Sequence, residues 1–122
     1  KAMMITCANS NQYGFNTVIS PTAKINDGLI DVCIFERIPI VETPLLSILL
    51  FLKKIDSSKH IEIIKTSEIT IIQTKKRPAH VDGDPIVSGK KINIRVNKKS
   101  LNVIVPKKTA EQLYPDFNKT VV

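Results

Sequence analysis

Residues 79–87 read Ala-His-Val-Asp-Gly-Asp-Pro-Ile-Val, and this stretch decides the class of fold. Asp82-Gly83 at its centre is typical of a tight hairpin turn, and apolar residues lie on both sides. The stretch therefore predicts two short antiparallel strands, 79–82 and 85–87. It places the protein among β-rich folds.

The same stretch carries two carboxylates, Asp82 and Asp84, on either side of one glycine. Side chains two residues apart in an extended chain point to the same side, so we expect the carboxylates to share a face. Such a pair can orient or deprotonate a hydroxyl group, or hold a hard cation. A plain hairpin turn explains the same residues, and the stretch alone leaves both interpretations open.

Short strand-like segments bounded by turn residues follow one another along most of the chain. The other expected strands are 2–8, 17–20, 29–35, 61–65, 69–74, 92–96 and 101–105. We expect 61–65 and 69–74 to pair across a turn near Thr66-Ser67. The prediction is a mainly β fold, an antiparallel β-sandwich or open barrel of about eight to ten strands.

One segment, 43–56, predicts a substantial helix, with Thr43 as its cap and Pro44 at its first position. Its apolar residues cover nearly the whole circumference, so the helix is either buried between layers or borders something apolar. We expect burial. A short helix is also expected at 109–114, within a C-terminal tail at 107–122.

Composition narrows the classes of function. The 122 residues suffice for one domain, and 43% hydrophobic residues permit a core. The net charge of +7 favours an anionic partner, such as nucleic acid, a membrane surface or phosphorylated molecules, although a lysine-rich soluble surface explains it equally well. Aromatic residues make up 5%, without Trp, which disfavours single-stranded nucleic acid.

Cysteine and histidine spacing indicates neither a zinc site nor a disulfide framework. Cys7 and Cys33 are far apart in the sequence, and His60 and His80 are isolated. Reduced thiols in a cytosolic protein are the expected state. No signal peptide is visible, and the longest apolar run, 44–52, is far shorter than the roughly 20 residues that span a bilayer.

A second turn, Asn26-Asp27-Gly28, offers a carboxylate and nearby carbonyls to Mg²⁺ or Ca²⁺. A hairpin turn with a solvated Asp27 is the alternative. Asp31 falls inside an apolar strand, where an unpaired carboxylate is costly. We therefore expect Asp31 to have a partner or to face solvent at an edge.

These motifs together resemble the C-terminal domain of the diacylglycerol kinase-like lipid kinases, which include bacterial lipid kinases and sphingosine and ceramide kinases. The matching residues, in the family's order across nearly the whole chain, are Asn9, Tyr13-Gly14, Pro21-Thr22-Ala23, Asn26-Asp27-Gly28-Leu29-Ile30-Asp31-Val32, Val81-Asp82-Gly83-Asp84 and Val103-Ile104-Val105-Pro106. The resemblance implies a two-domain enzyme in which an N-terminal domain binds ATP. The chain enters an apolar stretch directly at Lys1, so we expect it to be a piece of such a protein.

The resemblance also implies roles for individual residues. Asp84 stands where the family places the Glu that acts as general base on the lipid hydroxyl, and Asp82 is its companion. Asp27, with the carbonyls of Lys24 and Leu29, matches a structural Mg²⁺ site of bacterial members. The chain departs from the family by having Asp84 in place of Glu, and a single glycine, Gly14, in place of a glycine run.

Two basic clusters are candidates for contacts with a membrane or with phosphate, because anionic lipid attracts lysine and arginine. They are Lys53-Lys54, at the end of the apolar helix, and Lys75-Lys76-Arg77. Solvated loops explain these charges equally well.

Three hypotheses follow. The first is the substrate-side domain of an ATP- and Mg²⁺-dependent lipid kinase, cytoplasmic and peripheral at the membrane, inactive without its ATP-binding half. The second is a non-catalytic lipid- or membrane-binding module of the same fold. The third, a nucleic-acid-binding β domain, is disfavoured, and no nucleic-acid partner is expected. The sequence leaves open the identity of the lipid and the oligomeric state, a homodimer included.

Overall fold

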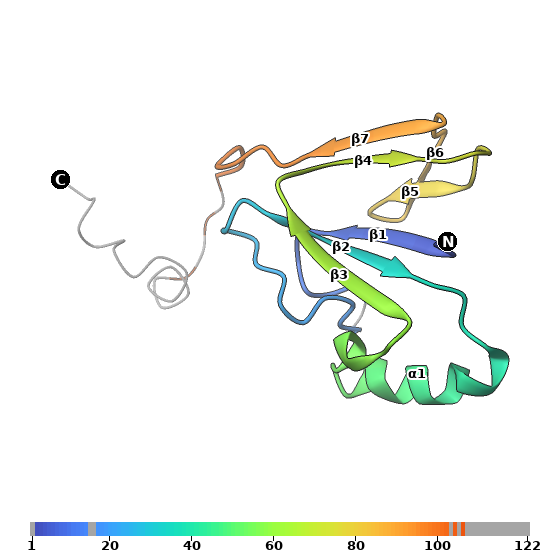
Figure 1. The fold of residues 1–122 in the computed structure, drawn as a ribbon. Coiled ribbons are helices and arrows are strands. Elements are labelled where there is room, and N and C mark those ends of the chain that lie inside the picture. The colour runs from blue at the N-terminus through green and yellow to red at the C-terminus, as the bar shows by residue number, and fades with distance from the viewer. Residues whose placement is uncertain (1, 15–16, 103, 105, 107–122) are drawn as a thin grey trace.

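The computed structural model describes residues 2–14, 17–102, 104 and 106. Seven strands, one α-helix and two 3-10 turns are assigned within them (Figure 1). The strands are β1 (Met4–Ala8), β2 (Ile30–Phe35), β3 (Ile61–Thr66), β4 (Glu68–Ile72), β5 (Ala79–Val81), β6 (Asp84–Ile86) and β7 (Lys91–Arg95). The helix is α1 (Thr43–Phe51), with the 3-10 turns η1 (Ile40–Glu42) before it and η2 (Ile55–Ser57) after it. The predicted mainly β architecture with one helix is confirmed.

The largest sheet is antiparallel, in the order β1-β2-β3. Thr6 pairs with Cys33, and Cys33 with Ile63, so these side chains share one face of the sheet. Cys7 pairs with Val32 and therefore lies on the opposite face from Cys33. This register keeps the two thiols apart, in agreement with the expected reduced cysteines, and both are free.

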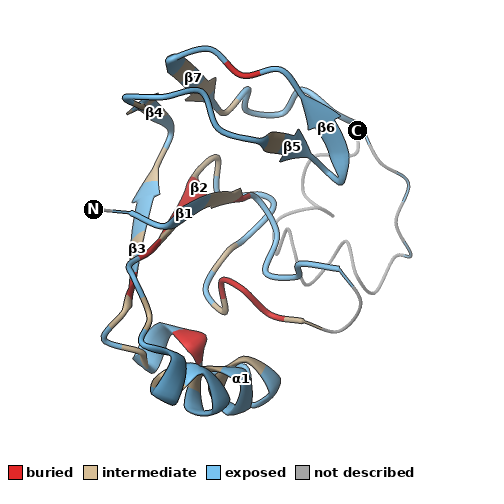
Figure 2. Cartoon of the chain, turned by 90° about the vertical axis from the view of Figure 1, so that its right-hand side faces the viewer, coloured by how far each residue is buried: buried red, intermediate tan, exposed pale blue. Residues whose placement is uncertain are grey.

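The hydrophobic core lies between this sheet and α1. Buried residues from β1, β2, β3, η2 and the loop before β2 form it, and they are Ala8, Ile19, Cys33, Phe35, Ile55 and Ile61. Leu46, Leu49 and Leu50 of α1 pack against this cluster. The helix thus covers one face of the sheet, and β4, β7, β5 and β6 lie on the other side (Figures 1 and 2). The domain has three layers.

The predicted pairing of 61–65 with 69–74 is wrong. β3 pairs with β2, and β4 pairs with β7 in a separate two-stranded sheet. A single residue, Ser67, separates β3 from β4, whereas the shortest common hairpin loops have about two residues. Thr66 bridges this corner, because its Oγ1 donates to the Glu68 carbonyl at 2.7 Å. The chain therefore passes from one sheet to the next.

The predicted strand at 17–20 is also wrong. Val18 forms an isolated bridge with Gln12, and the backbone N–H of Ile19 donates to the Asn11 carbonyl at 3.1 Å. Residues 17–20 thus lie against residues 11–14. Val18, Ile19 and Ser20 are buried through packing instead of through pairing in a sheet.

The helix is shorter and more exposed than predicted. It ends at Phe51 because Lys53 adopts a left-handed conformation, with a φ of 59°. Its N-cap residue is Glu42, not Thr43. No residue of α1 is buried, and Phe51 is 84% exposed, so the expectation of burial is wrong for this part of the chain. The apolar surface of the helix exceeds what one sheet face can cover.

The remaining predictions concern the end of the chain. Leu101, Asn102 and Ile104 are not in a strand, whereas 103 and 105 of the predicted strand 101–105 lie outside the described residues. The predicted tail at 107–122, with its helix at 109–114, lies outside them entirely. Within the described part of the chain, no helix is long and apolar enough to span a membrane.

Candidate functional site

The Asp82-Gly83 turn joins β5 to β6, as predicted. Val81 pairs with Asp84 and His80 with Pro85, so the loop has two residues. Both loop residues have positive φ angles, 50° for Asp82 and 98° for Gly83. Positive φ at both positions is the signature of a type I′ turn, which matches the twist of the flanking strands. Asp-Gly suits this turn because both residues tolerate that conformation.

Asp82 and Asp84 both lie on this hairpin, and both are exposed. The chain is not extended at Asp82, so the alternation that predicted a shared face does not apply here. Asp82 is a turn residue, and Asp84 begins β6. The two carboxylates therefore lie on different backbone conformations, a turn at Asp82 and a strand at Asp84.

A contact that the sequence did not predict links this hairpin to the loop at 9–14. The Tyr13 hydroxyl lies 3.2 Å from Nε2 of His80, and the two ring centroids are 6.2 Å apart. The backbone N–H of Gly83 donates to Nδ1 of the same ring at 3.3 Å. One histidine therefore contacts both the turn and Tyr13. The predicted hairpin already placed His80 beside the turn, but its partner is 67 residues away in the sequence.

Asp31 is buried and has three hydrogen-bonding side chains around it, in agreement with the expected partner. Its Oδ2 accepts hydrogen bonds from Ser20 Oγ at 2.5 Å and Thr22 Oγ1 at 3.2 Å, and Lys65 Nζ lies 2.7 Å from Oδ1. Burial by itself raises the pKa of Asp31, but the hydrogen bond from Lys65, that from Ser20 and the Lys65 charge outweigh it, so the pKa is lowered. Through these bonds the Asp31 carboxylate of β2 connects to Lys65 of β3 and to the loop at 20–22.

The Asn26-Asp27-Gly28 turn precedes β2. Oδ1 of Asp27 accepts a hydrogen bond from the Leu29 N–H at 2.9 Å, and Gly28 has a φ of 70°. The side chain of Lys98 lies directly over Gly28, where a Cβ would be 2.6 Å from Lys98 Cε. This turn is therefore ordered by its own hydrogen bond and covered by a second loop.

We compared the turn with the requirements of Mg²⁺. An exposed carboxylate at Asp27 and the carbonyls of Lys24 and Leu29 are hard oxygen donors, which suit this ion. They include one carboxylate, and within the described residues no group of three or more His, Cys, Asp or Glu side chains is placed to hold a metal. These oxygen donors are of the chemical type that Mg²⁺ accepts, and they would hold the ion with a single carboxylate among them.

An apolar cavity of about 210 Å³ lies where α1, the main sheet and the loop containing Tyr13 meet. Its lining residues are Met4, Tyr13, Thr17, Ile19, Phe35, Leu46, Ser47, Leu50 and Ile55. Tyr13 thus contributes both to this cavity and to the contact with His80 on the hairpin. The volume is below the roughly 300–1,000 Å³ of typical ligand pockets, so there is room for only part of a ligand of ordinary size.

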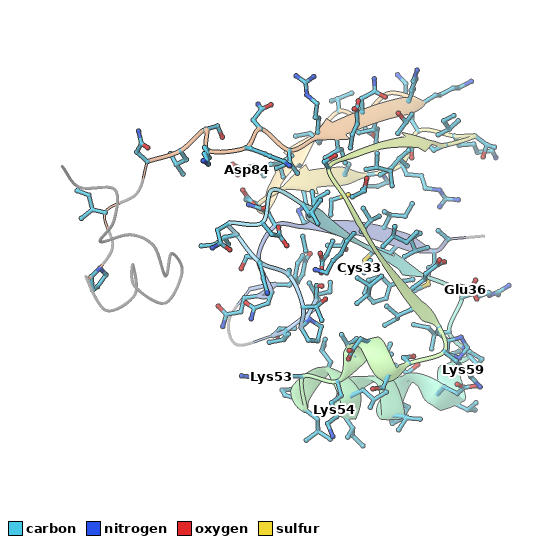
Figure 3. The ribbon with its side chains drawn as sticks, turned by 60° about the vertical axis from the view of Figure 1, so that its left-hand side comes forward. Cys33, Glu36, Lys53, Lys54, Lys59 and Asp84 are labelled. Atoms are coloured by element: carbon cyan, nitrogen blue, oxygen red, sulfur yellow. The ribbon has the colours of Figure 1, made fainter. Side chains whose placement is uncertain are left out.

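The basic residues predicted to contact a membrane or phosphate are all exposed and occupy two regions. Lys53 and Lys54 lie at the end of α1, on the far side of the domain from Asp84 (Figure 3). Lys75, Lys76 and Arg77 lie in the connection from β4 to β5. The fold does not bring the two clusters together.

The cysteines are not poised as nucleophiles. Burial raises the pKa of Cys33 to about 11, and burial also raises that of Cys7. His60 lies near the start of α1, where its Nε2 is 2.8 Å from Glu42 Oε2. The hydrogen bond from His60 lowers the pKa of Glu42. We assign these groups to packing and to attachment of the helix.

The chain was compared with known proteins. The family model described as the YegS C-terminal NAD kinase beta sandwich-like domain matches residues 1–105. Comparison with curated proteins gives no match. The matched region includes both turns, α1 and all seven described strands.

Proposed function

Because the chain belongs to the family of YegS C-terminal NAD kinase beta sandwich-like domains, we propose that it is the substrate-side domain of an ATP- and Mg²⁺-dependent lipid kinase. The acceptor is the hydroxyl group of diacylglycerol or a related lipid. ATP is bound mainly by a separate N-terminal kinase domain of the full-length protein. The complete enzyme works in the cytoplasm, at the membrane surface.

The observation that supports a lipid substrate is the position of Tyr13. Its ring lines the apolar cavity beside α1, and its hydroxyl contacts His80 on the hairpin that carries Asp84. A lipid alcohol has an apolar chain next to a reactive hydroxyl group. In this domain Tyr13 lines an apolar cavity and also contacts the hairpin on which the carboxylates lie, which suits such a molecule.

The chemistry assigned to the hairpin is orientation of the nucleophile. Phosphoryl transfer depends on positioning and charge neutralisation, with a carboxylate accepting the proton of the attacking hydroxyl group. Asp84 takes that role, and Asp82 orients the hydroxyl group beside it. Bound Mg²⁺ supplies charge neutralisation at the phosphates. Because Asp84 is one methylene shorter than the family's glutamate, the lipid hydroxyl has to approach the hairpin more closely.

Two further assignments follow from the same proposal. Asp27, with the carbonyls of Lys24 and Leu29, holds a structural Mg²⁺ that stabilises the turn before β2. Lys75, Lys76 and Arg77 contact phosphate or lipid head groups, since they are exposed on the connection that leads into the hairpin.

The test is a phosphorylation assay with the full-length protein, Mg²⁺-ATP and vesicles containing diacylglycerol or a sphingoid lipid. Asp84→Asn removes the base while keeping its size, and we expect turnover to fall about 100-fold or more. Asp56→Asn, which changes an exposed carboxylate in η2, is the matched control. No phosphorylated lipid with the unmodified protein, or equal turnover in both variants, refutes the proposal.

A non-catalytic membrane-binding module is the second candidate, favoured by the exposed apolar face of α1. Ile48 is 54% exposed and Phe51 is 84% exposed, and Lys53 and Lys54 follow after Leu52. An apolar helix face beside lysines is suited to the interface of an anionic membrane. Sedimentation with anionic vesicles tests this: Phe51→Ser should weaken binding while leaving folding intact. Binding without any lipid phosphorylation would favour this candidate over the kinase.

A further inference from the structure

His80 makes two hydrogen bonds, and the direction of the one with Gly83 sets the direction of the one with Tyr13. The backbone N–H of Gly83 can only donate, so Nδ1 of His80 accepts its bond. In the neutral ring the proton is therefore on Nε2, which donates to the Tyr13 hydroxyl. The ring thus joins the tip of the hairpin to the loop at 9–14.

The hairpin is held at its base by a separate set of contacts. Ser88 Oγ donates to the Arg77 carbonyl at 3.0 Å, and Gln73 Nε2 donates to the Gly89 carbonyl at 2.8 Å. These bonds lie where the chain enters and leaves β5 and β6. These bonds do not involve the tip of the hairpin. The contacts near the tip are those of His80 with Gly83 and Tyr13.

The loop that carries Tyr13 is itself attached to the core. The Tyr13 N–H donates to the Thr17 carbonyl at 2.7 Å, and Ile19, a few residues on, is 5% exposed in the main core. The backbone at Tyr13 is therefore attached to the main sheet's side of the molecule, although the Tyr13 residue is 45% exposed. A bond to its hydroxyl connects the separate β5–β6 hairpin to the core.

We propose that His80 is a positioning residue, which holds the Asp82-Gly83 tip against Tyr13 and thereby orients Asp84 toward the lipid hydroxyl. The inference rests on the proposed function of Asp84. His80 does not itself contact the reacting atoms. Its two nitrogens act separately, so substitutions can remove one bond at a time.

Four variants of the full-length protein test the two hydrogen bonds of His80 separately. His80→Ala removes both bonds, and His80→Asn keeps an acceptor near Nδ1 for the Gly83 N–H but cannot reach Tyr13. His80→Gln keeps a donor near Nε2 for Tyr13, and Tyr13→Phe removes the hydroxyl. His60→Gln, on the α1 side, is the matched histidine control.

We expect His80→Ala to lower kcat about 10- to 100-fold with KM within about twofold, because small displacements of a reacting group are costly in rate. Tyr13→Phe and His80→Asn should give equal partial losses, and Tyr13→Phe combined with His80→Asn should lose no more than either alone. ¹⁵N NMR of His80 should show a protonated Nε2 and an unprotonated Nδ1. The Gly83 amide signal should shift in His80→Ala and stay near its original position in His80→Asn.

The outcomes separate this inference from the proposed function. Loss of turnover in Asp84→Asn, with full turnover in His80→Ala and Tyr13→Phe, overturns the positioning role and leaves the kinase proposal standing. An Asp84→Asn variant that keeps full turnover overturns the proposed function, and with it the orientation of Asp84 by His80. A Gly83 amide signal that does not respond to His80→Ala also overturns the inference.

Discussion

Replacing Asp31 with asparagine should destabilise the domain more than any exposed carboxylate substitution. The Asp31 side chain is 2% exposed and accepts bonds from Ser20, Thr22 and Lys65, whereas the Lys65 side chain is 38% exposed. Breaking a buried ion pair costs about 3–5 kcal/mol when the remaining charge stays buried. Because the Lys65 ammonium can reach water and asparagine still accepts one hydrogen bond, we expect a loss of about 2 kcal/mol.

The measurement is urea unfolding at neutral pH, followed by far-UV circular dichroism. Asp27→Asn is the matched control, because Asp27 is exposed and bonds locally to Leu29; its effect should be within about 0.5 kcal/mol. A double-mutant cycle with Lys65→Met should show that the two substitutions are not additive. A loss for Asp31→Asn no larger than that for Asp27→Asn would refute the argument from buried charge.

The same variant has a defined pH dependence. The pKa of Asp31 is lowered in the folded protein, so the ionised carboxylate stabilises the fold above the ordinary aspartate pKa of about 4. This contribution is lost as the pH falls through the lowered pKa. Asp31→Asn should therefore differ most from the unmodified protein near neutral pH, and the difference should shrink below about pH 4. A difference that does not change with pH would contradict the assignment.

Three other predictions concern single sites. Ile55→Ala, at a core residue 1% exposed, should lower the free energy of unfolding by about 2–4 kcal/mol in the same urea experiment, and a loss below about 1 kcal/mol would contradict its place in the core. Gly28→Ala should cost about 1–2 kcal/mol, because φ is 70° there and the Lys98 side chain has to move; an unchanged midpoint would show that this turn is not ordered as described. Iodoacetamide should alkylate half-buried Cys7 before Cys33, whose pKa is about 11, as mass spectrometry can establish; faster reaction of Cys33 would be inconsistent with its burial.

Local sequence was sufficient where local chemistry decides the structure. Asp82-Gly83 predicted its hairpin because few residue pairs tolerate positive φ at two consecutive positions. The apolar run before Glu36 predicted β2, and the carboxylate within that strand predicted that Asp31 has a partner or faces solvent at an edge, of which the first is observed. These features depend on a few neighbouring residues, so they are visible without knowledge of the fold.

Prediction failed where partners distant in the sequence decide the outcome. Strands β3 and β4 are adjacent in sequence, but each pairs with a strand elsewhere, because one intervening residue cannot form a hairpin. The helix has apolar residues on all sides, yet one sheet covers only one of its faces. A local sequence pattern shows neither which strands pair nor how much of the helix surface the sheet covers.

The sequence by itself determined a β-rich domain, a hairpin with a two-residue Asp82-Gly83 loop, and a set of motifs that resemble a kinase C-terminal domain. Only the tertiary structure decided which residues meet at that hairpin. Tyr13 and His80 lie 67 residues apart, and their contact depends on how the loop at 9–14 and a separate two-stranded sheet are placed around the core. Turn chemistry acts over a few residues, whereas the packing that joins these two segments involves the whole domain.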